Sequence, residues 1–261
     1  MRGDNTERLL RGFDLRSHLQ AWSDMLLAMS DSRLTGERRR AMLVLVLLVP
    51  VPSVGAAMML FIAEGAVGSV AVGLCKLWIL LLPLAWHIWV DKQPVVVSRP
   101  TGAGMVPAVL LGAAILAVML AVFYGYAWQR IPLDKVSASA ARMHIDTPLG
   151  FAVLFSFMVL LNSLLEEYVW RWFVFRQCER LMPVPAAIAA SALMFTLHHV
   201  IAIATWAQWT ENLLASLGVF VGACVWSCLY LQYRTIWPAY ICHVFADIAI
   251  FIIGLHLIFD F

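Results

Sequence analysis

Long apolar runs dominate this sequence and constrain how it can fold. A membrane-spanning helix needs roughly 20 mostly apolar residues. About seven runs reach this length, at approximately residues 41–63, 66–90, 104–128, 148–175, 184–206, 212–233 and 236–259. Of all residues, 62% are hydrophobic and 13% charged, whereas soluble domains are about 45–50% apolar and about 25% charged. The sequence therefore predicts an all-α polytopic membrane bundle, with a membrane domain over residues 41–261.

The charges flanking these runs predict an orientation. Arg38, Arg39 and Arg40 abut the first run, and the positive-inside bias places such a cluster in the cytoplasm. Most later loop charges agree with a cytoplasmic amino terminus: Lys92, Arg99, Arg176, Arg180 and Arg234. Arg130, Lys135 and Arg142 fall in a loop placed outside and disagree with it. Compact size and short loops favour a bacterial inner membrane.

The segment before the first run, residues 1–40, carries an amphipathic pattern. Its apolar side chains recur at spacings of four and three, which forms one stripe of a helix, at Leu15, Leu19, Trp22, Leu26 and Met29. We expect either a helix lying in the membrane interface or a soluble cap on the cytoplasmic loops. The formal net charge of +2 indicates no nucleic-acid partner, so the expected partners are the bilayer and a substrate. No feature indicates an oligomeric state.

Seven ionisable residues interrupt three of the last four apolar runs. Charged groups at membrane depth cost several kcal/mol and usually mark a site, a pathway or a paired contact. They fall into three groups: Glu166, Glu167 and Arg171; His198 and His199; His243 and Asp247. Acid and imidazole groups that converge in lipid suggest proton-transfer chemistry away from bulk water.

The first group separates two adjacent glutamates by direction. Glu167 and Arg171 are four apart, so they share a helix face and can pair. Glu166 points about 100° away and lacks that partner, which suits a general base. The alternative is a helix end whose charges reach the interface. However, the apolar residues through Phe175 continue the run and place Glu166 about 15 Å below that end.

The histidines support several interpretations. Two adjacent helical residues point in different directions, so we expect at most one of His198 and His199 to face a common cavity. His243 and Asp247 are four apart and share a face. They are compatible with a carboxylate–imidazole pair, with two metal ligands, or with donors to an oxyanion.

In combination, these motifs resemble the CAAX-protease and bacteriocin-processing family of glutamic intramembrane proteases, also called the CPBP or Abi family. The family signature is Glu-Glu-x-x-x-Arg, then Phe-x-x-x-His, then His-x-x-x-Asn/Asp. Here it reads Glu166-Glu167…Arg171, Phe195…His199 and His243…Asp247. The resemblance covers roughly residues 148–250, so this part is the expected catalytic core.

The resemblance implies a hydrolytic mechanism without a cofactor. Glu166 and His199 would activate a water, and His243 and Asp247 would stabilise the tetrahedral oxyanion. The substrate would be a membrane-associated protein or peptide: a prenylated CAAX terminus, a bacteriocin-type leader or a sorting tail.

The resemblance leaves some roles open. Glu167 and Arg171 would hold the site or contact the polar end of the substrate. Asp247 replaces the Asn of many members, so it must be protonated to donate to an oxyanion, or else orient His243. His198 adds a second imidazole beside the motif histidine.

Other functions remain as alternatives. Zinc could bind Glu166, His199, His243 and Asp247 with one open position, but the HExxH arrangement of zincins is missing. A transporter or proton relay would also use buried acids and histidines, although we find no internal repeat and no Gly or Pro breaker near these residues. A family member without activity could act as a membrane scaffold.

Overall fold

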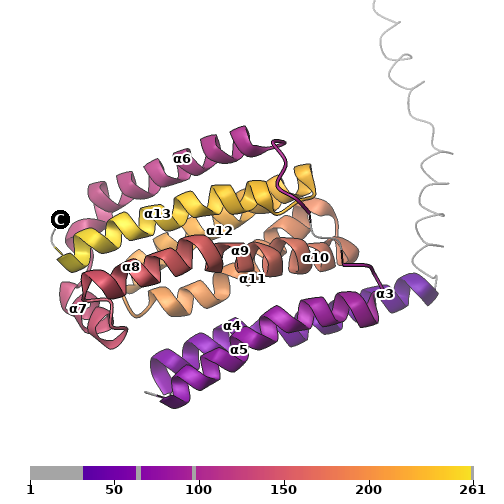
Figure 1. Cartoon of the computed structure of the whole chain (residues 1–261), viewed down its shortest axis with the longest axis horizontal. Helices are drawn as coiled ribbons and strands as arrows, with labels where there is room; N and C mark the ends of the chain where they lie inside the picture. The colour runs from indigo at the N-terminus through magenta and orange to yellow at the C-terminus, as the bar shows by residue number, and fades with distance from the viewer. Residues whose placement is uncertain (1–31, 63–65, 96–97, 260–261) are drawn as a thin grey trace, which may run out of the picture.

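Helices joined by short connections make up the computed structural model, which describes residues 32–62, 66–95 and 98–259 (Figure 1). No strand occurs in these three stretches. The amphipathic helix expected over residues 15–29 lies outside the described residues. The all-α class is therefore confirmed.

Within the described residues, seven helices are long and apolar enough to cross a membrane, which confirms the predicted number and makes the chain an integral membrane protein. They are Thr35–Ala57, Val67–Val90, Met105–Arg130, Pro148–Leu181, Val184–Ile203, Trp209–Tyr233 and Trp237–Phe259. The first span begins six residues earlier than the apolar pattern predicted. The helix is continuous across residue 40, so the arginine cluster lies on its first turns.

The first two spans form a pair along one side of the molecule (Figure 1). The first lies in α3 (Ser32–Leu48) and α4 (Pro50–Ala57), which η1 (Met58–Ile62) follows. The second lies in α5 (Ala66–Ala85) and η2 (Trp86–Val90). The break between α3 and α4 falls at Val49, directly before Pro50 and Pro52, because proline lacks the N–H that a continuous helix needs. Trp78 Nε1 donates a 3.0 Å hydrogen bond to the Leu47 carbonyl, which joins the pair.

The third span leads into a helix that the sequence did not predict. It comprises α6 (Met105–Val122), η3 (Phe123–Ala127) and η4 (Trp128–Arg130). The following segment was expected to be a loop outside the membrane, but it contains α7 (Leu133–Arg142). This helix buries Val136, Ser139 and Ala140, and Ser139 Oγ donates to the Thr205 carbonyl at 3.3 Å. α7 is therefore packed against α13 and is also bonded to the turn that follows the fifth span.

The last four spans form the core of the bundle. The fourth is one long irregular helix made of α8 (Pro148–Ser156), η5 (Phe157–Asn162), α9 (Ser163–Glu167), η6 (Tyr168–Phe175) and α10 (Arg176–Leu181). Thr147 caps it by accepting a 3.2 Å hydrogen bond from the Gly150 N–H. The remaining three are α11 (Val184–Ile203), α12 (Trp209–Tyr233) and α13 (Trp237–Phe259).

Charged contacts join several elements at one end of the bundle. Arg38 donates to the Leu181 carbonyl at 3.0 Å. Arg180 pairs with Asp91 at 3.0 Å, and Arg234 makes two hydrogen bonds to Glu179, at 2.8 and 2.9 Å. These bonds raise the pKa of Arg234. The start of α3 and the ends of η2, α10 and α12 therefore meet at the same end.

The third and last spans pack closely at a glycine. α6 lies along α13 (Figure 1), and Gly112 is buried in this contact. A Cβ at Gly112 would lie only 2.6 Å from the Phe245 ring. The absence of a side chain at this position therefore allows the two helices to approach.

We expect Gly112→Ala to destabilise the protein by about 1–3 kcal/mol, because overpacking forces side chains or backbone to shift. Thermal unfolding of purified protein in detergent measures the effect. Gly73→Ala in α5 is the matched control, since a Cβ there meets no atom within 4 Å. Equal melting temperatures for the two variants would show that the close approach does not matter.

Candidate active site

The seven ionisable residues singled out in the sequence come from four elements, which belong to three of the last four spans. Glu166 and Glu167 lie in α9 with Arg171 just beyond in η6, whereas His198 and His199 lie in α11, and His243 and Asp247 in α13. α13 packs against α9, and α11 against η6. The structure therefore brings residues up to 81 positions apart in the sequence into one cluster.

The helix that carries the two glutamates is irregular on both sides of them. α9 has only five residues and lies between the π-helical segments η5 and η6. Ser163 Oγ donates to the Met158 carbonyl five residues back, at 2.8 Å. π-Helical segments inside α-helices occur frequently at functional sites, and here they set the directions in which Glu166 and Glu167 point.

Glu167 is the centre of a buried polar network. Its Oε1 accepts a 2.8 Å hydrogen bond from His243 Nδ1 and lies 3.1 Å from Arg171 Nη1. The side chains of Glu167 and Arg171 are 0% and 1% exposed. The predicted pair four residues apart is confirmed, and this pair also holds a histidine from α13.

Aromatic rings and a carbonyl enclose the Arg171 guanidinium. Its Cζ lies 4.7 Å from the Phe195 ring centroid and 4.9 Å from that of Trp226. Nη2 donates to the Ala223 carbonyl at 3.4 Å. Removing one member of a buried ion pair leaves an uncompensated charge, which is strongly destabilising. The enclosed guanidinium therefore depends on Glu167.

His243 has one ring nitrogen engaged and one directed at two other carboxyls. Because an ionised carboxylate can only accept, Nδ1 carries a proton and donates it to Glu167. Nε2 lies 3.7 Å from Glu166 Oε2 and 3.9 Å from Asp247 Oδ1. Trp226 stacks on the imidazole with centroids 3.8 Å apart and planes at 15°. This packing fixes the plane in which Nε2 points.

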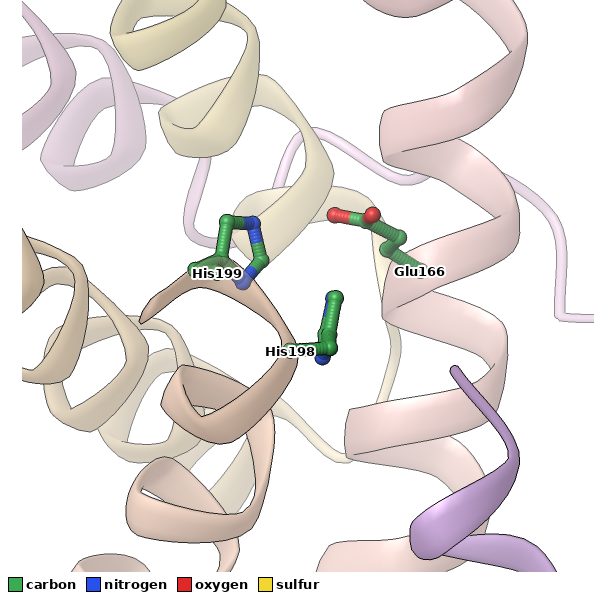
Figure 2. Close-up of side chains that lie close together, drawn as sticks. All are labelled: Glu166, His198 and His199. Atoms are coloured by element: carbon green, nitrogen blue, oxygen red, sulfur yellow. The ribbon is translucent and has the colours of Figure 1, made fainter. Parts of the chain in front are cut away.

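Glu166 lies beside the two histidines of α11 (Figure 2). Its Oε1 accepts a 2.9 Å hydrogen bond from Asn162 Nδ2, one turn earlier. Its side chain is 20% exposed, unlike that of Glu167. Glu166 is therefore held by one neighbour while remaining accessible.

His199 presents a free lone pair. Its Nδ1 lies 3.0 Å from the Phe195 carbonyl, and a carbonyl can only accept, so this nitrogen carries the proton. In the neutral ring Nε2 is then an acceptor. The arrangement supplies a carboxylate and an imidazole that can both accept from one water.

His198 also approaches Glu166, contrary to our expectation that at most one of the adjacent histidines would do so. One donor atom from each of Glu166, His198 and His199 lies within 4.8 Å of the others. The His198 and His199 ring centroids are 4.2 Å apart. The 100° step between adjacent helix positions does not separate the rings, because both side chains turn toward α9 (Figure 2).

Asp247 is anchored by a serine. Ser163 Oγ is hydrogen-bonded to Asp247 Oδ2 and lies 2.8 and 3.2 Å from the carbonyls of Met158 and Val159. One hydroxyl hydrogen cannot serve three acceptors at once. A proton on Asp247 would satisfy the cluster, because the acid would donate to Ser163 Oγ and the hydroxyl to a carbonyl.

Sequence reasoning missed three residues that shape this site: Asn162, Ser163 and Trp226. Asn162 stands four residues before Glu166, a spacing that indicates a shared helix face. Ser163 has no comparable signal, since its partner lies 84 positions away. Trp226 sits well inside its span, whereas membrane tryptophans are enriched at the two interfaces. The unusual depth of Trp226 in the span could therefore have indicated a role in the site.

Comparison with known proteins finds a family that resembles the last part of the chain. Residues 148–249 match the family model described as Rce1-like, type II CAAX prenyl endopeptidase Rce1-like. No curated protein and no solved structure matches the chain. The matched residues carry every element of the cluster described above, and they coincide with the segment whose motifs resembled CAAX proteases. This segment is therefore similar to the Rce1-like type II CAAX endopeptidase family, and the similarity implies a protease that hydrolyses peptide bonds.

Proposed function

We propose that this protein cleaves a membrane-associated protein or peptide by means of a water activated by Glu166 and His199. One observation supports the proposal. The accessible carboxylate of Glu166 and the lone pair of His199 face the same space, and a hydrogen bond to a neighbouring group orients each of them. Asn162 holds Glu166, and the Phe195 carbonyl holds His199. The protease family of residues 148–249 supports hydrolysis over transport.

In the proposed reaction, Glu166 accepts a proton from the water while His199 Nε2 orients it. The resulting hydroxide attacks the carbonyl carbon of the scissile bond and forms a tetrahedral intermediate. Glu166 then returns the proton to the leaving amine, and the carbon–nitrogen bond breaks. The products are a carboxylic acid and an amine, so the reaction consumes only water and the peptide.

His243 and Asp247 supply the groups that we propose for the oxyanion. Protonated at both nitrogens, His243 donates from Nε2, and the Glu167 carboxylate 2.8 Å from Nδ1 stabilises the positive ring. Asp247 donates in its protonated form, which the competition around Ser163 favours. Donors fixed before the reaction act most strongly where water is excluded.

We propose a positioning role for Glu167 and Arg171 rather than contact with the substrate. Both side chains are enclosed, at 0% and 1% exposure, so a substrate entering the site would meet Glu166 first. Arg171 balances the charge of Glu167, and Glu167 orients His243.

The depth of the site supports a membrane-anchored substrate. Glu166 lies 15 residues before Leu181, the last residue of its span, or about 22 Å along the helix. A scissile bond must reach this depth, and a lipid-anchored or membrane-inserted chain does so without leaving the bilayer. The family description names CAAX prenyl substrates, and such a terminus is one member of this class.

We further propose that the amino terminus faces the cytoplasm of a bacterial cell. The arginines at the start of α3 and those of α10 and α12 gather at one end of the bundle, as the positive-inside bias requires of a cytoplasmic face.

The orientation predicts which of two cysteines, each introduced in place of an exposed lysine, a membrane-impermeant thiol reagent can label. Lys92 and Lys135 are both exposed and follow successive spans. We expect Lys135→Cys to be labelled in spheroplasts, and Lys92→Cys only after lysis. The opposite pattern would reverse the orientation.

Glu166→Gln should abolish turnover without affecting folding, because Gln keeps the shape of the side chain but cannot accept the proton of the water. A loss of at least about 10²–10⁴-fold is typical of a missing general base. Protein termini in membranes from cells carrying each variant measure the effect, as the substrate then accumulates uncleaved. Glu37→Gln is the control, since Glu37 is exposed in α3. Wild-type cleavage by Glu166→Gln would rule out the water-activating role.

The neighbouring substitution should have a different effect. Glu167→Gln leaves Arg171 buried without its counter-charge, which costs about 3–5 kcal/mol. We expect a lower unfolding midpoint in detergent for Glu167→Gln than for Glu166→Gln. Adding Arg171→Met to Glu167→Gln should recover part of the loss. A double variant as unstable as Glu167→Gln alone would contradict the pairing argument.

A further inference from the structure

We propose that Glu166, His198 and His199 form a binding site for one divalent transition-metal ion such as Zn²⁺, and that the bound ion inhibits hydrolysis. The two parts are separable. Binding follows from the geometry of the three side chains alone, whereas inhibition rests on the proposed function.

The three donor atoms are close enough to share an ion after small movements. They lie within 4.8 Å of one another. Three atoms with that spacing lie within about 2.8 Å of a common point, and zinc bonds to nitrogen and oxygen measure about 2.0–2.2 Å. Each side chain therefore needs to move by less than about 1 Å.

Two of the donors already have the outer contacts that metal ligands require. A ligating histidine usually gives its other N–H to a carbonyl or carboxylate, and ligating carboxylates are themselves hydrogen-bonded. His199 gives Nδ1–H to the Phe195 carbonyl at 3.0 Å. Glu166 Oε1 receives the Asn162 amide at 2.9 Å. These contacts orient His199 Nε2 and Glu166, whose Oε2 also lies 3.7 Å from His243 Nε2.

His198 supplies an independent observation. Its Nδ1 is buried and has no hydrogen-bond partner in the described part of the chain. Buried polar atoms are nearly always satisfied, and the proposed hydrolysis gives this ring no task. The ring is stacked on Trp170, with centroids 5.5 Å apart and planes at 11°. A metal ion would use one nitrogen of this ring as its third ligand, since one donor atom of His198 lies within 4.8 Å of those of Glu166 and His199.

The donor set indicates which ions fit. Two imidazoles suit zinc and other late first-row metals, whereas calcium and magnesium prefer oxygen ligands alone. Three protein ligands leave a fourth position for a water or for a substrate oxygen. We therefore expect Zn²⁺ and Co²⁺ to bind, and Mg²⁺ and Ca²⁺ not to compete.

The bound ion would inhibit hydrolysis because it coordinates the same lone pairs that bind the attacking water. Bound zinc occupies the carboxylate oxygen of Glu166 and the ring nitrogen of His199, which are the two groups that accept from the water. Neither can then orient the water or take its proton. The extra histidine next to the motif position thus makes the water-activating pair sensitive to zinc.

Metal binding to purified, metal-depleted protein in detergent tests the site directly. Equilibrium dialysis with Zn²⁺ followed by elemental analysis gives the stoichiometry, and the visible absorption of bound Co²⁺ reports nitrogen and oxygen ligation. His198→Phe removes the donor but keeps a ring against Trp170. His87→Phe is the matched control, because His87 lies 4.9 Å from Trp172 in another aromatic contact.

We expect one Zn²⁺ per wild-type chain and per His87→Phe chain. His198→Phe should weaken binding by more than about 100-fold, because the loss of outer-shell partners alone costs about 10–100-fold. The site is overturned if wild type binds no stoichiometric zinc, or if His198→Phe binds it as tightly as wild type.

The rate of cleavage tests the inhibition, with each variant compared with its own metal-free rate. Zinc should slow wild type over the concentration range in which it binds, and His198→Phe should resist it. Zinc that stimulates cleavage would overturn the inhibitory role. If the metal-free protein cleaves no substrate, the proposed function fails, while the zinc stoichiometry still decides whether the site exists.

Discussion

The hydrogen bond between Glu167 and His243 is the contact on which the rest of the cluster depends. It joins α9 to α13 at 2.8 Å between two buried side chains. A carboxylate is tolerated there only because Arg171 balances its charge. Arg171 is in turn enclosed by Phe195 of α11 and Trp226 of α12. One buried anion thus holds the last four spans in register, and the accessible residues are placed relative to it.

The two adjacent glutamates show how a one-residue step separates structure from chemistry. Glu167 faces the interior and meets only protein, whereas Glu166 faces the accessible side and meets Asn162 and the α11 histidines. The π-helical turns on either side give this short segment its own geometry. Donors and acceptors that are already oriented in a site of low dielectric stabilise the charge that develops in a transition state. The buried pair of Glu167 and Arg171 provides that orientation.

Local spacing predicted part of this arrangement. Runs of about 20 apolar residues indicate spans whatever their partners, and the Glu167–Arg171 pair needs only a spacing of four. The Glu167–His243 bond and the Ser163–Asp247 contact join residues 76 and 84 positions apart. The spacing of residues within one helix cannot predict contacts between helices that are so distant in the sequence. The helix Leu133–Arg142 was missed because its polar composition hides an apolar face of only a few small side chains. The approach of both α11 histidines depends on side-chain rotamers, which spacing does not specify.

Cleavage by purified protein in the presence of a chelator tests the central claim most directly. Wild type, Glu166→Gln and His199→Gln would be reconstituted in liposomes with a membrane-anchored substrate, after removal of metal. We predict that wild type cleaves without metal and that both variants lose cleavage while remaining folded. Wild-type activity that disappears with the chelator and returns with zinc would contradict it, because the nucleophile would then be a metal-bound water.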